Sequence, residues 1–288
     1  MKKYVAKIKL FLIIFDGRID FFNGCGYTKI MELYEHINQF KIKFCDVDFK
    51  DEIKISALLS YLEEVSCTSA DELGFGYDYI KGRNCAFFVT NYYLECVQPI
   101  TLADIIEVKT WPTPPSSVIF GREYQISTMS KGLQLNATSR WCLLDMKTGK
   151  ILPAKTLDNQ DYSTYNSTKL FPDMRWKIPT FALEESVLRF VITIANSEYD
   201  HNMHVNNTRY ADYCMNCFSV TDLSHRKLKS FALNFVRQCK EGETLRFYLK
   251  QSQVEEYFVQ GVNEQEEIVV QARINFAEGN NVEKENRC

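Results

Sequence analysis

Two stretches of the chain, one in each half, carry apolar residues at helical spacing. The first begins at Ile55 and the second at Tyr210, and in both an apolar residue recurs every three or four positions. That spacing brings the apolar side chains onto one face of a helix, so we predict an amphipathic helix in each half. The predicted buried faces are Ile55, Leu58, Leu59, Leu62 and Val65 in the first helix, and Tyr210, Tyr213, Cys214, Cys217 and Val220 in the second.

Strand-like segments accompany both helices. They are rich in Val, Ile, Phe, Tyr and Thr, which favour pleated, half-buried positions, and turn-forming sequences such as Lys131-Gly132 separate them. In the first half we predict strands at Cys85–Gln98, Ile105–Trp111, Ile119–Met129 and Gln134–Asp145. In the second half we predict them at Val187–Ala195, Ser230–Arg237, Thr244–Ser252, Glu255–Val262 and Glu267–Phe276. The repeated order of elements indicates an α+β fold built on an internal duplication.

Segments without periodicity mark the expected domain boundaries. Residues 158–180 are polar and contain two prolines, which is typical of a linker across the surface. Residues 1–30 hold an apolar run that Asp16 interrupts far short of a membrane-spanning length, so we expect a dispensable extension, with Met31 opening the folded protein. The predicted division is a 1–30 extension, a 31–157 N-terminal domain, a 158–180 linker, a 181–276 C-terminal domain with the functional motif, and a 277–288 polar tail.

Composition narrows the class of protein. The 288 residues are 45% hydrophobic and 25% charged with a net charge of −3, which is typical of a globular protein and argues against a general nucleic-acid binder. Ten cysteines are scattered along the chain. Cys214 and Cys217 have C-x-x-C spacing, but both lie on the predicted apolar helix face, so we expect them to pack in the core. Reduced thiols predict a cytoplasmic location.

A dense polar cluster, Asp200–Asn207, directly precedes the second predicted helix. One Asp, three Asn and two of the four histidines of the chain occupy six of its eight positions. The first amides of a helix lack intrahelical partners and lie at the positive end of its dipole, so they can stabilise developing negative charge. We therefore predict that the functional site lies here.

Three sequence motifs stand out. Asp200-His201-Asn202-Met203-His204-Val205-Asn206-Asn207-Thr208-Arg209-Tyr210 resembles the signature of the family of plant and bacterial acyl-acyl-carrier-protein (acyl-ACP) thioesterases. Val108–Arg122 is similar to its "TWP…R" strand pair, and Ala137–Asp145 to its "A-x-S-x-W-x-L-x-D" strand. The likeness extends over residues 31–276. It implies a tandem (double) hot-dog fold, in which two antiparallel sheets each wrap a long helix.

The resemblance also implies site residues. It gives catalytic roles to Asp200, Asn202 and His204. In this family an acidic residue and a cysteine on a strand of the second half complete the site, and here these positions hold Gln238 and Cys239. A glutamine cannot accept a proton, so this chain departs from the family pattern at Gln238.

The sequence leaves two mechanisms open. In the first, Asp200 deprotonates a water molecule that Gln238 orients, and Asn202 polarises the thioester. His204 then orients its neighbours or protonates the leaving thiolate. In the second, Cys239 is a nucleophile that His204 activates. The amides of the helix N-terminus would stabilise the oxyanion in both.

Two readings of the cluster involve no such chemistry. In a structural reading, Asp200 and Asn202 only turn the chain into the helix and cap it. In a metal reading, His201 and His204 join Asp200 as ligands, but three ligands in so tight a loop rarely reach one ion in good geometry. We expect neither a metal nor a cofactor.

The resemblance implies an enzyme that hydrolyses acyl-ACP, releases free fatty acid and ends fatty-acid synthesis. The alternatives are an acyl-CoA thioesterase and a non-catalytic acyl-binding hot-dog protein, and Gln238 favours the latter. The expected partner is acylated acyl carrier protein, an acidic protein that the basic run 225–229 could steer toward the site. We expect no binding of nucleic acid and no stable membrane insertion. A homodimer is possible. The acyl chain is expected to lie along the apolar face of the first helix, next to Phe87, Tyr92 and Tyr93.

Overall fold

The computed structural model describes residues 11–15, 18–22, 28–157 and 162–278. Within them the chain forms a small three-stranded sheet and a large antiparallel sheet of 11 strands. The small sheet consists of β1 (Phe11–Phe15), β2 (Arg18–Phe22) and β3 (Thr28–Glu32). The domain start expected at Met31 falls inside β3, and residues 1–10 of the expected extension lie outside the described part, so this boundary stays a prediction.

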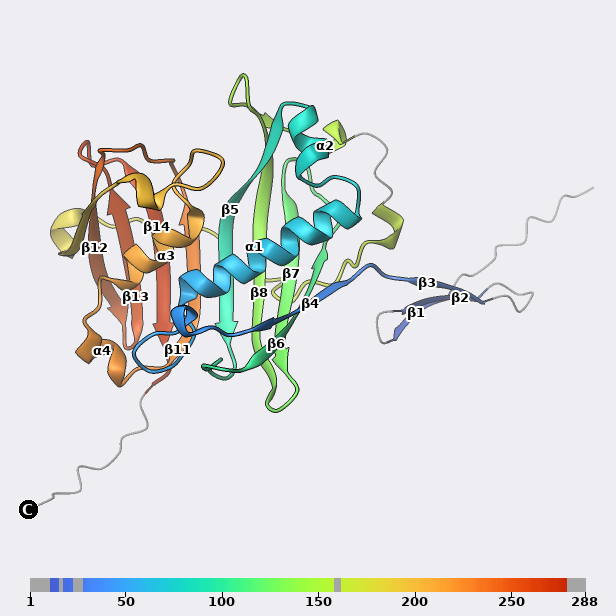
Figure 1. Ribbon diagram of the computed structural model, residues 1–288, viewed down its shortest axis with the longest axis horizontal. Helices are drawn as coiled ribbons and strands as arrows, with labels where there is room; N and C mark the ends of the chain where they lie inside the picture. The colour runs from blue at the N-terminus through green and yellow to red at the C-terminus, as the bar shows by residue number, and fades with distance from the viewer. Residues whose placement is uncertain (1–10, 16–17, 23–27, 158–161, 279–288) are drawn as a thin grey trace, which may run out of the picture.

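The N-terminal half confirms the predicted helix and strands. Helix α1 (Ile55–Glu72) buries all five residues of the predicted apolar face and lies across its strands (Figure 1). A short helix α2 (Tyr77–Gly82) follows it, which the periodicity did not predict. The strands run in the order β5-β8-β7-β6-β4. Their bounds are β4 (His36–Lys41), β5 (Cys85–Cys96), β6 (Ile105–Pro112), β7 (Phe120–Thr128) and β8 (Gly132–Asp145), and the short β9 (Ile151–Leu152) pairs with β8.

The C-terminal half repeats the plan with a shorter helix. Its strands run in the order β10-β12-β13-β14-β11, and α3 (Asn207–Met215) crosses them. The predicted helix face was wrong at Val220, which is 64% exposed. Helix α3 ends at Met215, and Val220 begins a separate short helix α4 (Val220–Ser224). Ser219 caps α4, because its Oγ accepts a hydrogen bond from the N–H of Asp222 at 3.0 Å. The strands are β10 (Val187–Thr193), β11 (Leu228–Phe235), β12 (Thr244–Gln253), β13 (Glu256–Val262) and β14 (Ile268–Phe276).

The two halves share one continuous sheet. Strand β11 pairs antiparallel with β5, so that Leu233 lies opposite Tyr92, and Asn91 Nδ2 donates to Asn234 Oδ1 at 2.6 Å. The predicted α+β tandem hot-dog fold is therefore confirmed, with its two sheets joined at their edges. The pairing satisfies backbone groups on both edges that would otherwise face solvent.

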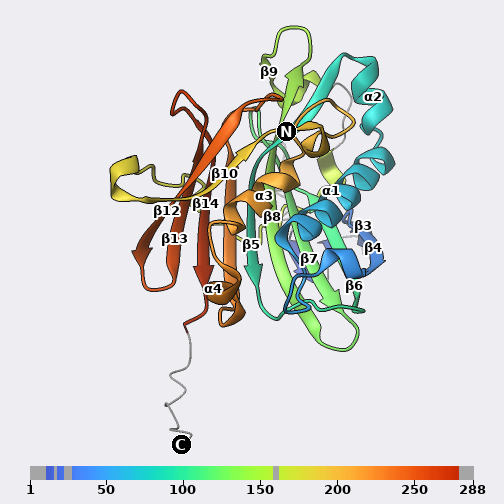
Figure 2. The same cartoon turned by 60° about the vertical axis from the view of Figure 1, so that its left-hand side comes forward.

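Helices α1 and α3 lie side by side on the same face of this sheet (Figures 1 and 2). Apolar residues of both helices, together with β5 and β11, form one buried cluster. At its edge the hydroxyl group of Ser56 on α1 forms a hydrogen bond with the carboxyl group of Asp212 on α3. Burial raises the pKa of Asp212 more than this hydrogen bond lowers it, so the net pKa is raised. Asp212 in the second half of α3 is thereby joined to the helix of the other half.

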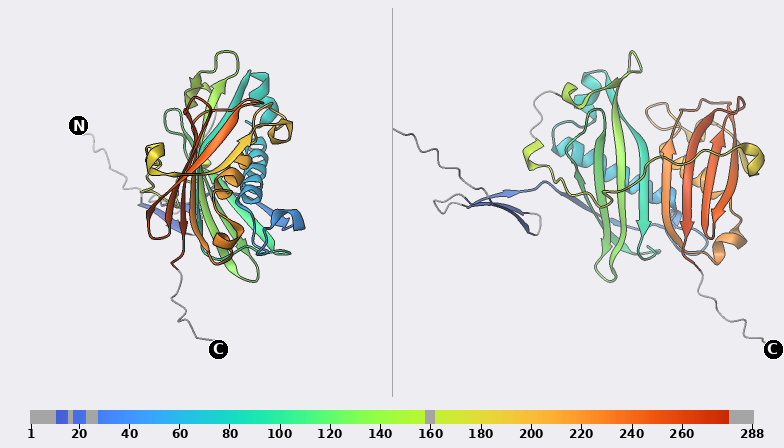
Figure 3. Two further views of the ribbon diagram at one scale, coloured as in Figure 1. Left: turned by 90° about the vertical axis from the view of Figure 1, so that its left-hand side faces the viewer. Right: turned by 180° about the vertical axis from the view of Figure 1, so that it is seen from behind.

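The segment between the halves crosses the opposite face of the sheet (Figure 3). Its residues 158–161 lie outside the described part of the chain. Beyond them Phe171 packs edge-on against Tyr93, with ring centroids 4.8 Å apart. Farther along, the Trp176 carbonyl accepts from Asn234 Nδ2 at 3.0 Å. These contacts cover the outer face where β5 meets β11.

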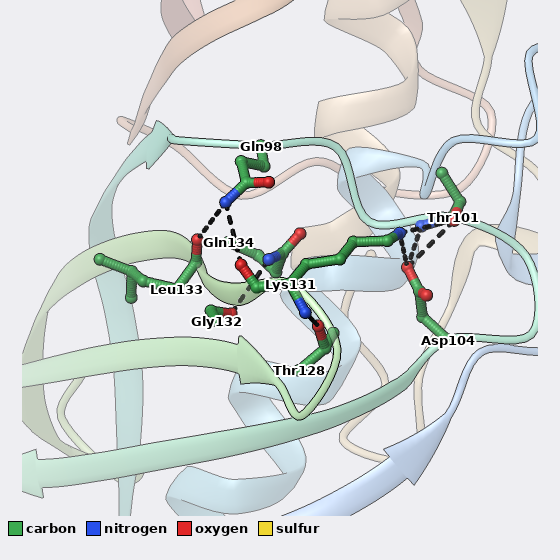
Figure 4. A network of polar contacts seen from close by, with 8 residues as sticks. All are labelled: Gln98, Thr101, Asp104, Thr128, Lys131, Gly132, Leu133 and Gln134. Atoms are coloured by element: carbon green, nitrogen blue, oxygen red, sulfur yellow. Dashed lines mark hydrogen bonds and ion pairs between the residues drawn. The ribbon is translucent and has the colours of Figure 1, made fainter.

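An exposed polar network fixes the far end of the N-terminal half (Figure 4). The ammonium group of Lys131, in the β7–β8 turn, lies 2.6 Å from Asp104 Oδ2 and 3.0 Å from Thr101 Oγ1. Gln98 Nε2 donates to the Lys131 carbonyl at 3.1 Å. These bonds join the β5–β6 and β7–β8 connections.

Of the helices described, none is long and apolar enough to cross a membrane.

Candidate active site

The polar cluster folds into a tight loop that leads into α3. Tyr199 and Val205 form an antiparallel bridge across its base, and the N–H of Asp200 donates to the His204 carbonyl at 2.8 Å. At the tip, Met203 has a φ of 60°, in the left-handed region, and donates its N–H to the Asp200 carbonyl at 3.1 Å. The loop therefore returns on itself over four residues and presents the side chains between Asp200 and His204 outward.

The Asp200 carboxylate closes this loop. Its Oδ1 accepts the backbone N–H of Asn202 at 2.8 Å and that of His204 at 3.2 Å. Its Oδ2 has no hydrogen-bond partner among the described residues. The helix cap is a different residue: Asn206 Oδ1 accepts from the N–H of Thr208 at 2.8 Å. The structural interpretation is thus right that Asp200 turns the chain into the helix. It is wrong that Asp200 or Asn202 caps α3, because the cap is Asn206.

The other polar side chains of the loop are free of protein hydrogen bonds in the described part of the chain. Asn202 is exposed, and His204 is partly buried with its ring centroid 5.2 Å from that of Phe88. His201 contacts Tyr77 on α2 edge-on at 5.7 Å. The amide of Asn202 is therefore available to a ligand, whereas His204 does not line the cavity that begins at this loop.

A cavity of about 520 Å³ begins at this loop and enters the N-terminal half. His201 and Asn202 line it where it meets the loop. Most of its other lining residues are apolar, which suits an acyl chain. From α1, α2 and the strands these include Ala70, Phe75, Ile80, Ala86, Phe87, Phe120 and Trp141.

We expected the acyl chain to lie along the apolar face of α1, but the cavity does not follow that face. That face, including Leu59 and Leu62, is buried in the core. The cavity instead touches the neighbouring flank of α1 at Glu63, Ser66, Cys67 and Ala70. Of the three strand aromatics predicted for an acyl channel, Phe87 lines it, whereas Tyr92 and Tyr93 do not.

Gly121 and Arg122 shape the wall of the cavity. A Cβ atom at Gly121 would lie 2.6 Å from Thr113 Oγ1, so only glycine fits without a shift of that side chain. Arg122 is buried and donates from Nη1 to Ser69 Oγ at 2.8 Å and to Thr110 Oγ1 at 3.2 Å. It thereby ties α1 to β6 along the cavity.

Gln238 and Cys239 are placed differently from the expectation. Strand β11 ends at Phe235, so both residues lie in the following loop rather than on the strand. The strand ends there because Val236 and Arg237 each donate an N–H to the Val269 carbonyl, which bends the chain out of register. Gln238 is exposed, whereas Cys239 is only 1% exposed. Neither residue lines the cavity.

The Cys239 thiol is held in its neutral form. Burial raises its pKa to about 11, although the Tyr210 hydroxyl beside it acts in the opposite direction. No hydrogen bond or ring contact joins it to His204 among the described residues. Cys239 is thus a buried cysteine next to α3, and its raised pKa does not favour an activated nucleophile.

The residue that sequence reasoning missed is Glu63 on α1. It is half-buried and lines the cavity together with His201 and Asn202. Burial raises the pKa of its carboxyl group, and the nearby charge of Asp200 raises it further, while His201 acts in the opposite direction. The signal available in the sequence was an acidic residue directly after buried Leu62 on the predicted helix, which alone does not distinguish it from a solvated residue.

Two family models match the chain. The model described as "Acyl-ACP thioesterase N-terminal domain" matches residues 34–156, and that described as "Acyl-ACP thioesterase C-terminal domain" matches residues 185–283. Together they cover most of the chain and both of its halves.

Curated relatives match at low identity. A chloroplastic palmitoyl-acyl carrier protein thioesterase of Gossypium hirsutum is 23% identical over 219 residues, which is 72% of this chain and 52% of that protein. A chloroplastic oleoyl-acyl carrier protein thioesterase of Arabidopsis thaliana is 18% identical over 73% of this chain and 61% of its own length. The chain thus spans about half the length of the first of these relatives.

Solved structures share the fold. An acyl-ACP thioesterase from Bacteroides thetaiotaomicron superposes with a TM-score of 0.77 at 19% identity, covering 84% of this chain and 98% of that one. A 12:0-ACP thioesterase from Umbellularia californica gives a TM-score of 0.74 at 17% identity, covering 84% of this chain and 97% of that one.

Proposed function

The chain belongs to the acyl-ACP thioesterase family, and on this premise we propose that it hydrolyses the thioester of a fatty acyl-ACP to free fatty acid and holo-ACP. The observation that carries the proposal is the position of the cavity. It begins at Asn202 in the motif loop and continues between apolar side chains of the N-terminal half. A thioester held at the loop would have its acyl chain in this cavity and its carrier protein outside.

Each loop residue has a role that its contacts allow. The exposed Asn202 amide would donate to the thioester carbonyl as it becomes an oxyanion. Asp200 keeps Oδ1 for the loop and would hold the attacking water through Oδ2. His204, packed against Phe88, would orient the thioester or protonate the thiolate as it leaves.

A water nucleophile agrees better with these contacts than Cys239 does. A thiol with a pKa of about 11 is almost fully protonated at neutral pH, and this one is buried away from the cavity. Attack by water needs no such thiolate. We therefore assign Cys239 to packing against Tyr210.

The proposed macromolecular partner is an acylated acyl carrier protein. The basic run 225–229 contributes less to its docking than its composition suggests, because Arg226 is paired with Glu255 at 3.4 Å and lies over the ring of Tyr257. The cysteines in the described residues are all unpaired, which favours a reducing compartment such as the cytoplasm.

Product analysis tests the proposal directly. Purified full-length protein is incubated with a series of saturated acyl-ACPs, and the free fatty acid and the new thiol are both measured over time. Hydrolysis should release them in equal amounts. We expect catalytic turnover that Asp200→Asn lowers by about two orders of magnitude. Saturable binding of acyl-ACP with no acid released would instead favour the non-catalytic acyl-binding protein.

A further inference from the structure

One carboxyl group in the cavity has no structural use. Glu63 is the only acidic residue that lines the cavity in the described part of the chain, and it shares that lining with Asn202 and His201 of the motif loop. It makes no hydrogen bond and no ion pair with any described residue. A half-buried carboxyl group without a protein partner is costly, and a ligand in the cavity would supply the missing partner.

The position where the family resemblance implies an acidic residue offers no alternative. It holds Gln238, which cannot take a proton, is exposed, and lies away from the cavity. Asp200 remains, but its Oδ1 already accepts two backbone N–H groups. A carboxylate that is free to exchange a proton at the thioester is therefore found on α1.

We propose that Glu63 is the general base of this site, a catalytic residue supplied by the N-terminal half to a motif in the C-terminal half. This inference rests on the proposed thioesterase function. A water molecule held between Glu63 and Asp200 attacks the thioester carbonyl, and Glu63 takes its proton as the new C–O bond forms. The tetrahedral intermediate then collapses, the C–S bond breaks, and the thiolate leaves with a proton from the Glu63 carboxyl group or from His204.

The electrostatic setting suits this role. Burial and the charge of Asp200 raise the pKa of Glu63, and a base whose pKa lies nearer the working pH accepts a proton more effectively. The charged groups that act on its pKa are Asp200 and His201 on the loop and Glu64 on α1. Its charge acts in turn on Cys67 and Tyr92, and the cationic side chains of Lys81 and Arg122 line the same cavity. Burial and the two carboxylates outweigh His201, so the net effect is to favour the protonated acid.

The test compares the dependence of kcat/KM on pH in matched variants of the full-length protein. In the wild type, the rate should fall as pH drops through the raised pKa of Glu63. Glu63→Gln should lower kcat by about 100-fold or more and remove that acid limb. Glu64→Gln, at an exposed position of the same helix, should keep kcat within about twofold of wild type and retain the acid limb, which moves slightly to lower pH because one neighbouring carboxylate is gone.

A second variant separates the role of Glu63 in catalysis from one in folding. Glu63→Ala should regain activity when formate is added, because formate restores a carboxylate in the space left behind, whereas a structural role would give no rescue. Wild-type kcat and an unchanged acid limb in Glu63→Gln would overturn the assignment and leave the thioesterase proposal standing. Absence of turnover by the wild type would overturn both.

Discussion

Asp200 Oδ1 lies 3.2 Å from the backbone nitrogen of His204, four residues farther along the chain, and 2.8 Å from that of Asn202. One carboxylate oxygen thus shapes the loop that presents the Asn202 and His204 side chains, while the other is left for chemistry. This division separates the structural part of Asp200 from its catalytic part, and substitutions can test them apart.

Asp200→Asn should keep the loop and lose the reaction. The amide oxygen can still accept both backbone N–H groups, but the negative charge that holds water is gone, so we expect kcat to fall by about two orders of magnitude with little change in stability. Asp200→Ala should lose the acceptor as well and cost about 1–2 kcal/mol of the free energy of unfolding. Acyl-ACP hydrolysis and urea denaturation measure the two effects. Near-normal turnover by Asp200→Asn would remove Asp200 from the chemistry.

Cys239→Ala should retain most of the activity. Its thiol is neutral at working pH and does not face the cavity, so its loss removes packing against Tyr210 rather than a nucleophile. We expect a loss of about 1 kcal/mol in stability and little change in kcat. Iodoacetamide at neutral pH should leave the buried Cys239 thiol of the wild type unmodified. Complete inactivation of a folded Cys239→Ala protein would instead restore the thiol mechanism.

Ala70→Phe should shorten the acyl chain that the protein prefers. Ala70 lies on the flank of α1 that lines the cavity, next to Phe75 and Ile80, and a larger side chain would occupy space needed by the distal methylenes. Each methylene that can no longer be buried costs about 0.8 kcal/mol, or roughly fourfold in kcat/KM. Ser60→Phe, at an exposed position of the same helix, is the control and should not change the preference. An unaltered chain-length profile in Ala70→Phe would show that the acyl chain lies elsewhere.

Lys131→Met should destabilise the protein in a manner that depends on pH. Burial acts to raise the pKa of Asp104, but hydrogen bonds from Lys131 and Thr101 outweigh it, and the net pKa is lowered. A lowered folded-state pKa stabilises the protein above the unfolded pKa, and that stability is lost as pH falls through the folded pKa. We expect Lys131→Met to cost up to about 1 kcal/mol at pH 7, because the pair is partly exposed. Urea titrations should show this difference disappearing in acid; a difference that persists there would mean that packing rather than charge is lost.

Local pattern predicted most of the fold. The spacing from Ile55 to Val65 identified α1 and its buried face, and β-rich segments identified nine strands of the large sheet. It failed at Val220, where apolar spacing continued by chance past the capping box that starts α4. The pairing of β11 with β5, which makes one sheet of two, depends on contacts between distant segments and has no local signature.

The site was predictable only in part for the same reason. The composition of Asp200–Asn207 and its family likeness located the loop. They could not show that one carboxylate oxygen of Asp200 accepts hydrogen bonds from two backbone N–H groups. The burial of Cys239 and the exposure of Gln238 follow from where β11 ends. Glu63 lies more than a hundred residues before the loop in the sequence, and only the packing of α1 beside α3 brings it to the cavity.

The central claim is that the loop and cavity act on a thioester presented by acyl carrier protein. The most direct measurement is kcat/KM for matched acyl-ACP and acyl-CoA substrates with the full-length wild-type protein. We predict turnover of both, with a higher kcat/KM for acyl-ACP at every chain length that is accepted. A higher kcat/KM for acyl-CoA, or binding of acyl-ACP without release of fatty acid, would contradict the account.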